Sequence, residues 1–103
     1  MTPTQRSLKH LREEGWLAEV VERWIPQARK RKDLFGFVDI VALRDDTTLG
    51  VQVTSGSNVS ARVHKIADSD LVGAVRCAGW AIHVHGWRKN SKGRYVLRVV
   101  DVS

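Results

Sequence analysis

One carboxylate in this sequence lies where an acid is costly. Asp39 falls inside a run, residues 37 to 43, that otherwise holds only apolar residues. Such a run is typical of a strand covered on both faces. Because burying an unpaired charge costs on the order of several kcal/mol, Asp39 must be paired, bound to a metal ion or placed at the exposed end of a sheet. A structural ion pair with a nearby arginine is the alternative to a metal ligand.

Gln52 is the residue best placed to bind the same metal ion as Asp39. A polar turn over residues 44 to 48 separates the first run from a second predicted strand over residues 49 to 54. A gap this short predicts an antiparallel hairpin. Counting outward from two central turn residues places Gln52 directly opposite Asp39 and on the same face. A slip of one residue would turn Gln52 to the other face, and an inert polar strand residue is the alternative.

Further polar side chains are predicted close to this pair. Thr54 shares the strand face of Gln52, and a helix predicted over residues 59 to 68 bears Arg62 and Lys65. A part for these side chains in a site with Asp39 is one interpretation. The alternatives are a structural strand threonine and a solvated helix face.

Two basic clusters account for much of the net charge of +6. Five cations and no acid lie in each, namely Arg23, Arg29, Lys30, Arg31 and Lys32 in the first and Arg88, Lys89, Lys92, Arg94 and Arg98 in the second. Such clusters suit a polyanion and predict salt-dependent binding. We expect residues 29 to 32, Arg88 and Lys89 to contact nucleic acid, with Trp87 as a candidate for stacking on a base. A generically basic surface is the alternative.

The N-terminal elements follow from capping signals. Thr2, Pro3 and Gln5 form a helix-start signature, which predicts a helix over residues 3 to 14. Residues 16 to 24 fit a helical or a strand period, and their adjacent valines favour a strand. Glu19 and Glu22 reach the Asp39 region if these residues form a strand, and surface charges are the alternative.

The C-terminal half is predicted as a helical stretch followed by two strands. The expected elements are a helical stretch over 70 to 78, a half-buried strand over 80 to 85, a basic turn over 86 to 92 and a strand over 95 to 102. His83 and His85 are expected on the outer face of the first strand. The order is then α-β-β-β-α-β-β, an antiparallel meander followed by a helical crossover to a further strand.

Length and composition bound the remaining possibilities. The 103 residues suit one α/β domain over residues 1–103, with a mixed sheet flanked by helices. No apolar run approaches the roughly 18 residues that span a bilayer, so no membrane partner is expected. The single cysteine, Cys77, is expected to be buried and favours a reducing, cytoplasmic setting.

The sequence resembles a known family. Asp39 in an apolar strand is followed thirteen residues later by Gln52-Val53-Thr54, and then by a helix bearing Arg62 and Lys65. This pattern resembles the PD-(D/E)XK nuclease superfamily, and most closely its Holliday-junction resolvase-like and phage VRR-type branch. Segments 29–40, 52–58 and 85–89 carry the resemblance, which extends to about residue 90.

The resemblance implies a restriction-endonuclease-like core and a site for Mg²⁺ or Mn²⁺. Asp39, Gln52 and the Val53 carbonyl would be the metal ligands. Gln52 stands where the family has an acid, and Thr54 stands where it has a lysine, so Lys65 or Arg62 would supply the catalytic cation. Resolvase-like members carry a glutamate early in the first helix, and Gln5 stands at the matching place.

The resemblance also implies a function. It is that of a metal-dependent endonuclease that hydrolyses phosphodiester bonds in DNA, including branched or structured DNA. Relatives that cut junctions are two-fold dimers, so a homodimer is expected, and a phage or mobile-element origin is implied. Two alternatives remain open. One is the same fold, catalytically weak or inactive, that only binds nucleic acid, and the other is a basic RNA-binding domain that needs no metal.

Overall fold

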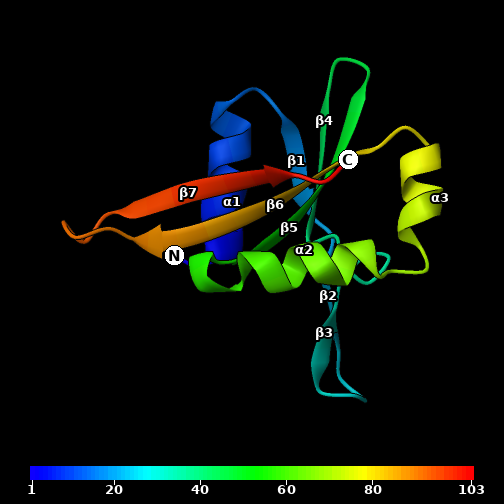
Figure 1. The fold of residues 1–103 in the computed structure, drawn as a ribbon, viewed down its shortest axis with the longest axis horizontal. Helices are drawn as coiled ribbons and strands as arrows, with labels where there is room; N and C mark the ends of the chain where they lie inside the picture. Colours follow the sequence, from blue (N-terminus) through cyan, green and yellow to red (C-terminus); the bar gives the residue numbers. More distant parts are fainter.

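A five-stranded mixed sheet is the centre of the molecule (Figure 1). The computed structural model describes residues 1–103. The strand order is β1-β4-β5-β6-β7, and the strands are β1 (Leu17–Val20), β4 (Ile40–Arg44), β5 (Thr47–Ser55), β6 (Ala81–Lys89) and β7 (Tyr95–Asp101). Neighbouring strands are antiparallel except β5 and β6, which are parallel. The predicted meander and crossover are therefore confirmed at the level of an α/β fold.

Helices cover both faces of the sheet. On one face lies α1 (Pro3–Glu13), and on the other lie α2 (Val59–Ala67) and the short α3 (Val72–Cys77), with the single turn η1 (Gly56–Asn58) leading into α2. The capping box that predicts α1 is present, because Thr2 Oγ1 accepts from the Gln5 backbone N–H and Gln5 Oε1 accepts from that of Thr2. No helix is long and apolar enough to cross a membrane.

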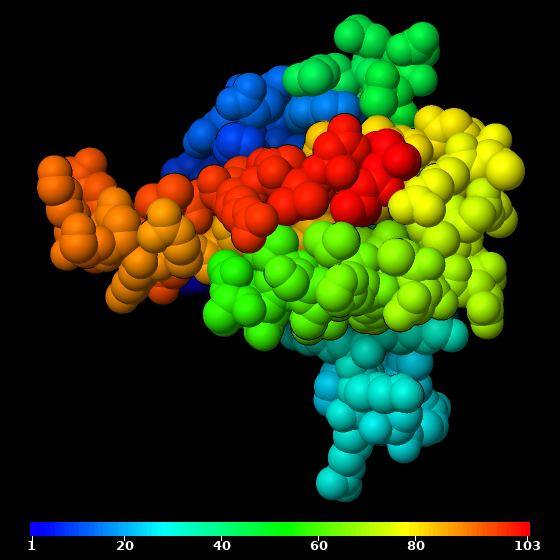
Figure 2. Space-filling view, viewed as in Figure 1, coloured from blue at the N-terminus to red at the C-terminus, as the bar shows by residue number.

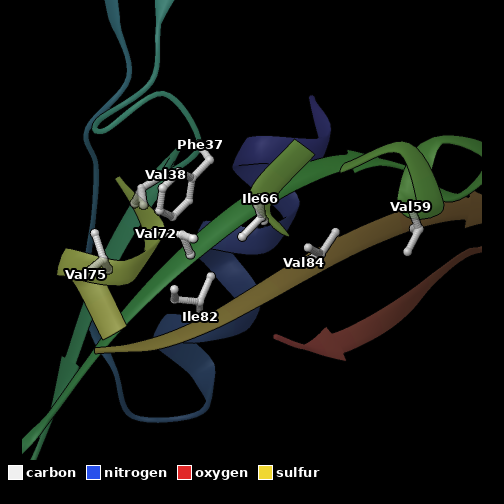
Figure 3. Packing of buried hydrophobic residues seen from close by; sticks show 8 residues of the cluster. All are labelled: Phe37, Val38, Val59, Ile66, Val72, Val75, Ile82 and Val84. Atoms are coloured by element: carbon white, nitrogen blue, oxygen red, sulfur yellow. The ribbon is translucent and has the colours of Figure 1, made fainter. Parts of the chain in front are cut away.

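Two apolar clusters lie on opposite faces of the sheet. The cluster under α2 and α3 consists of Phe37, Val38, Val59, Ile66, Val72, Val75, Ile82 and Val84 (Figure 3). The cluster under α1 consists of Leu11, Ala18, Ile40, Ala42, Leu49, Val51 and Val53. Helices cover β5 from both sides, and its residues from Leu49 to Thr54 are all buried. This double burial explains why the strand carries no charged residue.

The hairpin register is as predicted. Arg44 pairs with Thr47 and Ile40 pairs with Val51, as counted outward from the turn. The strand begins at Ile40, however, and residues 37 to 39 precede it rather than forming part of the strand. Asp39 lies one residue beyond the last pair, and its N–H donates to the carbonyl of Val51, the partner of Ile40, at 2.8 Å. Its side chain reaches Gln52 through a 2.7 Å hydrogen bond, so the predicted closeness of the two residues is confirmed by contact.

A second hairpin projects from the body and was not predicted. Its strands, β2 (Arg23–Ile25) and β3 (Lys30–Lys32), pair only with each other. Figures 1 and 2 show it as a narrow cyan arm that extends away from the sheet. The strand predicted through residue 24 therefore ends at Val20, because the chain leaves the sheet there to form the arm.

The second basic cluster also lies on a hairpin rather than in a turn region. β6 continues to Lys89, where it pairs with Tyr95, and the turn is confined to residues 90–94. The prediction of a turn over 86 to 92 is wrong, because pairing with β7 extends the strand past the end of its apolar alternation. Figure 2 shows this β6–β7 tip, in orange, as a second projection.

Two expectations about buried and exposed residues are wrong. Cys77 is exposed, because it lies in the last turn of α3 away from the core. His85 is buried beneath α1 instead of lying on an outer face, and its Nδ1 shares a 2.9 Å hydrogen bond with the Ser7 hydroxyl. Trp87, a predicted stacking residue, donates its indole N–H to the same Ser7 oxygen at 2.8 Å. These three side chains join α1 to β6.

Candidate functional site

Asp39 is buried and held by hydrogen bonds rather than by an ion pair. Only 4% of the residue is exposed. Its Oδ2 accepts from the Val53 backbone N–H and from Gln52 Nε2, each at 2.7 Å. No lysine, arginine or histidine forms an ion pair with it. The structure therefore brings Asp39, Gln52 and Val53 together, and the arginine pair weighed as an alternative is not formed.

Two further carboxylates complete an acidic cluster around Asp39. One oxygen from each of Glu22, Asp33 and Asp39 lies within 4.8 Å of the others. Glu22 immediately precedes β2 and Asp33 immediately follows β3, so the two roots of the projecting hairpin supply them. Asp33 is the site residue that sequence reasoning missed. An acid directly after four consecutive basic residues and six residues before Asp39 was the available signal.

The cluster favours a proton or another cation on Asp39. The pKa of Asp39 is raised to about 7, and burial is the largest cause. A hydrogen bond shared with Asp33 and the negative charges of Asp33 and Glu22 act in the same direction, while the Val53 N–H opposes the shift. Three acids this close, with one of them buried, repel each other unless positive charge lies between them. A divalent cation with oxygen ligands would supply that charge.

Two basic side chains flank the cluster without reaching Asp39. Arg31 Nη1 lies 3.1 Å from Glu22 Oε1, and Lys65 Nζ lies 3.8 Å from Asp33 Oδ2. Lys65 is thus beside the acids, as expected for a cation supplied by α2. Arg62 lies one turn earlier on α2, half-buried and without an ion pair.

The amide of Gln52 leaves one oxygen without a partner. Its Nε2 donates to Asp39, but its Oε1 is buried and accepts no hydrogen bond. An unsatisfied buried acceptor costs about 1–3 kcal/mol, so an unpaired oxygen on the side chain that contacts Asp39 fits a hard cation that binds oxygen. The N–H and C=O of a strand residue point toward the same neighbour, which turns the Val53 carbonyl toward Asp39 as well. The donor set therefore fits Mg²⁺ or Mn²⁺.

Three other candidates lie at different distances from this centre. Thr54 is buried at the end of β5, on the face of Gln52. Gln5 uses its side chain in the α1 capping box but lines an open cleft of about 390 Å³ together with Glu22 and Arg31. Glu19 does not reach the site, because it pairs with Arg12 at 3.8 Å and lies outside the acidic cluster, and the alternative of a surface charge is confirmed for it. The chain turns out of the sheet after Val20, so Glu22 takes the place that Glu19 was expected to fill.

The predicted nucleic-acid contacts lie on the two projecting hairpins. Arg29 is in the turn of the β2–β3 hairpin, and Lys30, Arg31 and Lys32 form β3, all of them exposed. Arg88 and Lys89 end β6 on the other projection and are also exposed. Only the first hairpin is continuous with the acidic cluster, because Glu22 and Asp33 are its two ends.

No protein-family model matches the chain, and no curated protein is significantly similar to it in sequence.

Proposed function

We propose that this chain is a PD-(D/E)XK-type endonuclease domain that hydrolyses phosphodiester bonds in DNA with the help of Mg²⁺ or Mn²⁺. The observation that carries the proposal is the Glu22, Asp33 and Asp39 cluster at the root of a basic hairpin, with Gln52 hydrogen-bonded to Asp39. The clustered acids could hold a metal ion, and the basic hairpin beside them could hold a DNA backbone so that a phosphate contacts this ion. Branched or structured DNA is the substrate class that the resemblance favours.

The arrangement of elements supports a restriction-endonuclease-like core. A first helix, a three-stranded meander, a helical crossover and two further strands follow in the order that the superfamily has, with the β2–β3 hairpin inserted into the meander. Asp39 and Gln52 lie where the first two long strands approach α2. The insertion adds two carboxylates in a chain that has Gln52 in place of the family's acid.

The residues divide the chemistry among them. The carboxylates of Asp39, Asp33 and Glu22, the Gln52 Oε1 and the Val53 carbonyl would hold the cation. When bound, such a cation lowers the pKa of a coordinated water and neutralises charge on the phosphate. Lys65, beside Asp33, would stabilise charge on the phosphate oxygens. The Thr54 hydroxyl would orient the attacking water, and residues 29–32 would hold the DNA backbone in register.

A DNA cleavage assay tests the proposal. Supercoiled plasmid and a four-way junction are incubated with the protein and Mg²⁺ or Mn²⁺. We expect cleavage by the natural sequence and by Glu19→Gln, which removes an acid outside the cluster. Asp39→Ala should abolish cleavage. Equal cleavage by the Asp39→Ala protein would identify a contaminating nuclease and leave the proposal without support.

A binding module without catalysis is the second candidate, and Thr54 favours it. A threonine at the family's lysine position cannot supply a positive charge, and Lys65 is already paired with Asp33. Isothermal titration with Mn²⁺ separates the two candidates. An endonuclease should bind Mn²⁺ and lose that binding in Asp39→Asn. A chain that binds DNA or RNA but no Mn²⁺ is a binding module.

A homodimer is proposed as well. Leu17 on the edge strand β1 is directly paired with Leu43 on β4, and the two are 67% and 44% exposed. Apolar side chains on an edge strand suit an interface with a second copy. Sedimentation analysis of the natural sequence and of Leu17→Lys tests this, since the substitution should yield a monomer.

A further inference from the structure

Trp24 is an exposed aromatic side chain on the β2–β3 hairpin. It is 56% exposed and belongs to neither apolar cluster. It makes no aromatic or cation–π contact, unlike the three other tryptophans. The hairpin that carries it is two-stranded, and such a ribbon is marginally stable alone. More than half of the Trp24 side chain is thus available to a ligand.

The arm has two chemically different faces. Trp24 pairs directly with Arg31, so these two side chains share one face. Arg23, Lys30 and Lys32 alternate with them and therefore lie on the other face. Arg31 contacts Glu22 at 3.1 Å, which turns the Trp24 face toward the acidic cluster. The basic face suits phosphates, whereas an aromatic ring suits the flat surface of a base.

The position of Trp24 relates it to the acidic cluster. It lies two residues from Glu22, which corresponds to roughly 7 Å of extended strand. Arg31 and Glu22 also line the cleft of about 390 Å³ that opens beside the N-terminal end of α1. A base stacked on Trp24 would therefore belong to a nucleotide close to the phosphate at the cluster.

We propose that Trp24 stacks on an unpaired base next to the acidic cluster, so that the preferred substrate is DNA with unpaired nucleotides at the site of cleavage. This inference rests on the proposed nuclease function. In an intact duplex each base is already stacked on both sides, and exposing one costs free energy that an unpaired base does not. The basic face, which needs only phosphates, binds both kinds of DNA.

Fluorescence anisotropy of the full chain in EDTA tests the inference without cleavage. The probes are a fluorescein-labelled duplex and the same duplex with a short single-stranded gap. We expect the natural sequence to prefer the gapped probe, and Trp24→Leu to lose about tenfold or more in affinity for it. Affinity for the intact duplex should change less than about threefold, and Trp24→Phe should restore most of the preference.

A second measurement reports stacking directly. 2-Aminopurine placed in the gap should be quenched by the natural sequence and remain brighter with Trp24→Leu. Equal losses on both probes would mean that Trp24 binds duplex grooves and would overturn the inference, as would no loss on either. Asp39→Asn should keep the gap preference in EDTA, so a chain that fails to cleave DNA can still show whether Trp24 selects unpaired bases.

Discussion

Asp39 is a residue whose environment opposes its ionised form. It is buried among hydrogen-bond donors from Gln52 and Val53, yet two more carboxylates lie within 4.8 Å. Residues that destabilise a fold locally are typical of functional sites, where stability is exchanged for reactivity. The orphaned Gln52 Oε1 at the same place adds to this cost.

Asp39→Asn should stabilise the protein at pH 8 in EDTA. The folded-state pKa of Asp39 is raised from 3.8 to about 7, so the folded state loses stability as the pH rises through that window. An asparagine keeps an oxygen for Gln52 and Val53 and carries no charge. We expect a gain on the order of 1–3 kcal/mol by urea denaturation, shrinking toward pH 4. Glu19→Gln is the control and should change little, and a loss of stability in Asp39→Asn at pH 8 would contradict the argument.

His85 should produce the opposite pH dependence. Burial, then the charges of His10 and His83, lowers its pKa from 6.5 to about 4. Unfolded chains therefore take up the proton first, and stability falls as the pH drops from 6.5 to 4, by roughly 3 kcal/mol in total. Because Asp39 titrates in the same window with the opposite sign, the effect should appear most clearly in Asp39→Asn. Urea denaturation of that variant at several pH values checks this. A free energy of unfolding that does not change with pH would show that His85 is protonated as readily in the folded state as in the unfolded state.

At the scale of elements, the packing of α2 on the sheet sets the position of Lys65. α2 begins at Val59, directly over β6, and Gly86 provides the space for that contact. A side-chain carbon at Gly86 would collide with Val59 Cγ2 and approach the Gly56 backbone at 3.4 Å. The glycine therefore allows the helix and the strand to come this close.

Gly86→Ala should destabilise the fold by about 1–3 kcal/mol, as overpacking does. It should also weaken Mn²⁺ binding or DNA cleavage, since α2 would move together with Lys65. Gly73→Ala is the matched control. Gly73 lies in α3, where an added side-chain carbon would have no neighbour within 4 Å, and alanine there should stabilise by about 0.5–1 kcal/mol. Thermal unfolding of both variants is the measurement, and similar Tm values would count against the close contact.

The sequence predicts the long elements well and the arm poorly. The helix caps and the apolar periods of α1, β5 and α2 locate these elements to within two residues. The hairpin register follows from a short turn and holds as far as Ile40 and Val51, and Asp39 contacts Gln52 just beyond it. The β2–β3 hairpin has strands of three mostly exposed residues, so it lacks the alternation that identifies a strand. Glu22 and Asp33 meet Asp39 only because this hairpin returns the chain to its starting point, which no local pattern reveals.

At the scale of the whole molecule, the two basic clusters lie on projecting hairpins, and the acidic cluster lies at the base of the β2–β3 hairpin. Two of the hairpins that extend from the body, β2–β3 and β6–β7, carry basic side chains, whereas the turn of the third, β4–β5, carries Asp45 and Asp46 (Figure 2). The three acids of the cluster lie beneath only one of them. If the proposed function is right, DNA attracted by the overall positive charge would meet the acidic cluster only at the base of the β2–β3 hairpin.

Salt dependence should reveal which arm holds the DNA. Replacing Lys30 and Lys32 by alanine removes two cations from the basic face of the β2–β3 hairpin. The slope of log affinity against log salt should fall by about 0.9 for each duplex phosphate that the arm no longer neutralises. Lys9→Ala is the control, because Lys9 lies on α1 and pairs with Glu13. An unchanged slope in the double variant would assign the phosphate-binding role to the β6–β7 hairpin.

The two ends of the β2–β3 hairpin have a thermodynamic consequence. Glu22 and Asp33 close the arm at its base, so any ligand that fixes their separation also restricts how the arm moves. A cation at the base and a DNA strand along the arm are then linked ligands. By reciprocity, whatever factor the cation adds to the affinity for DNA, the DNA adds to the affinity for the cation. The hairpin would thus couple the two binding sites, so that each ligand would change the affinity for the other.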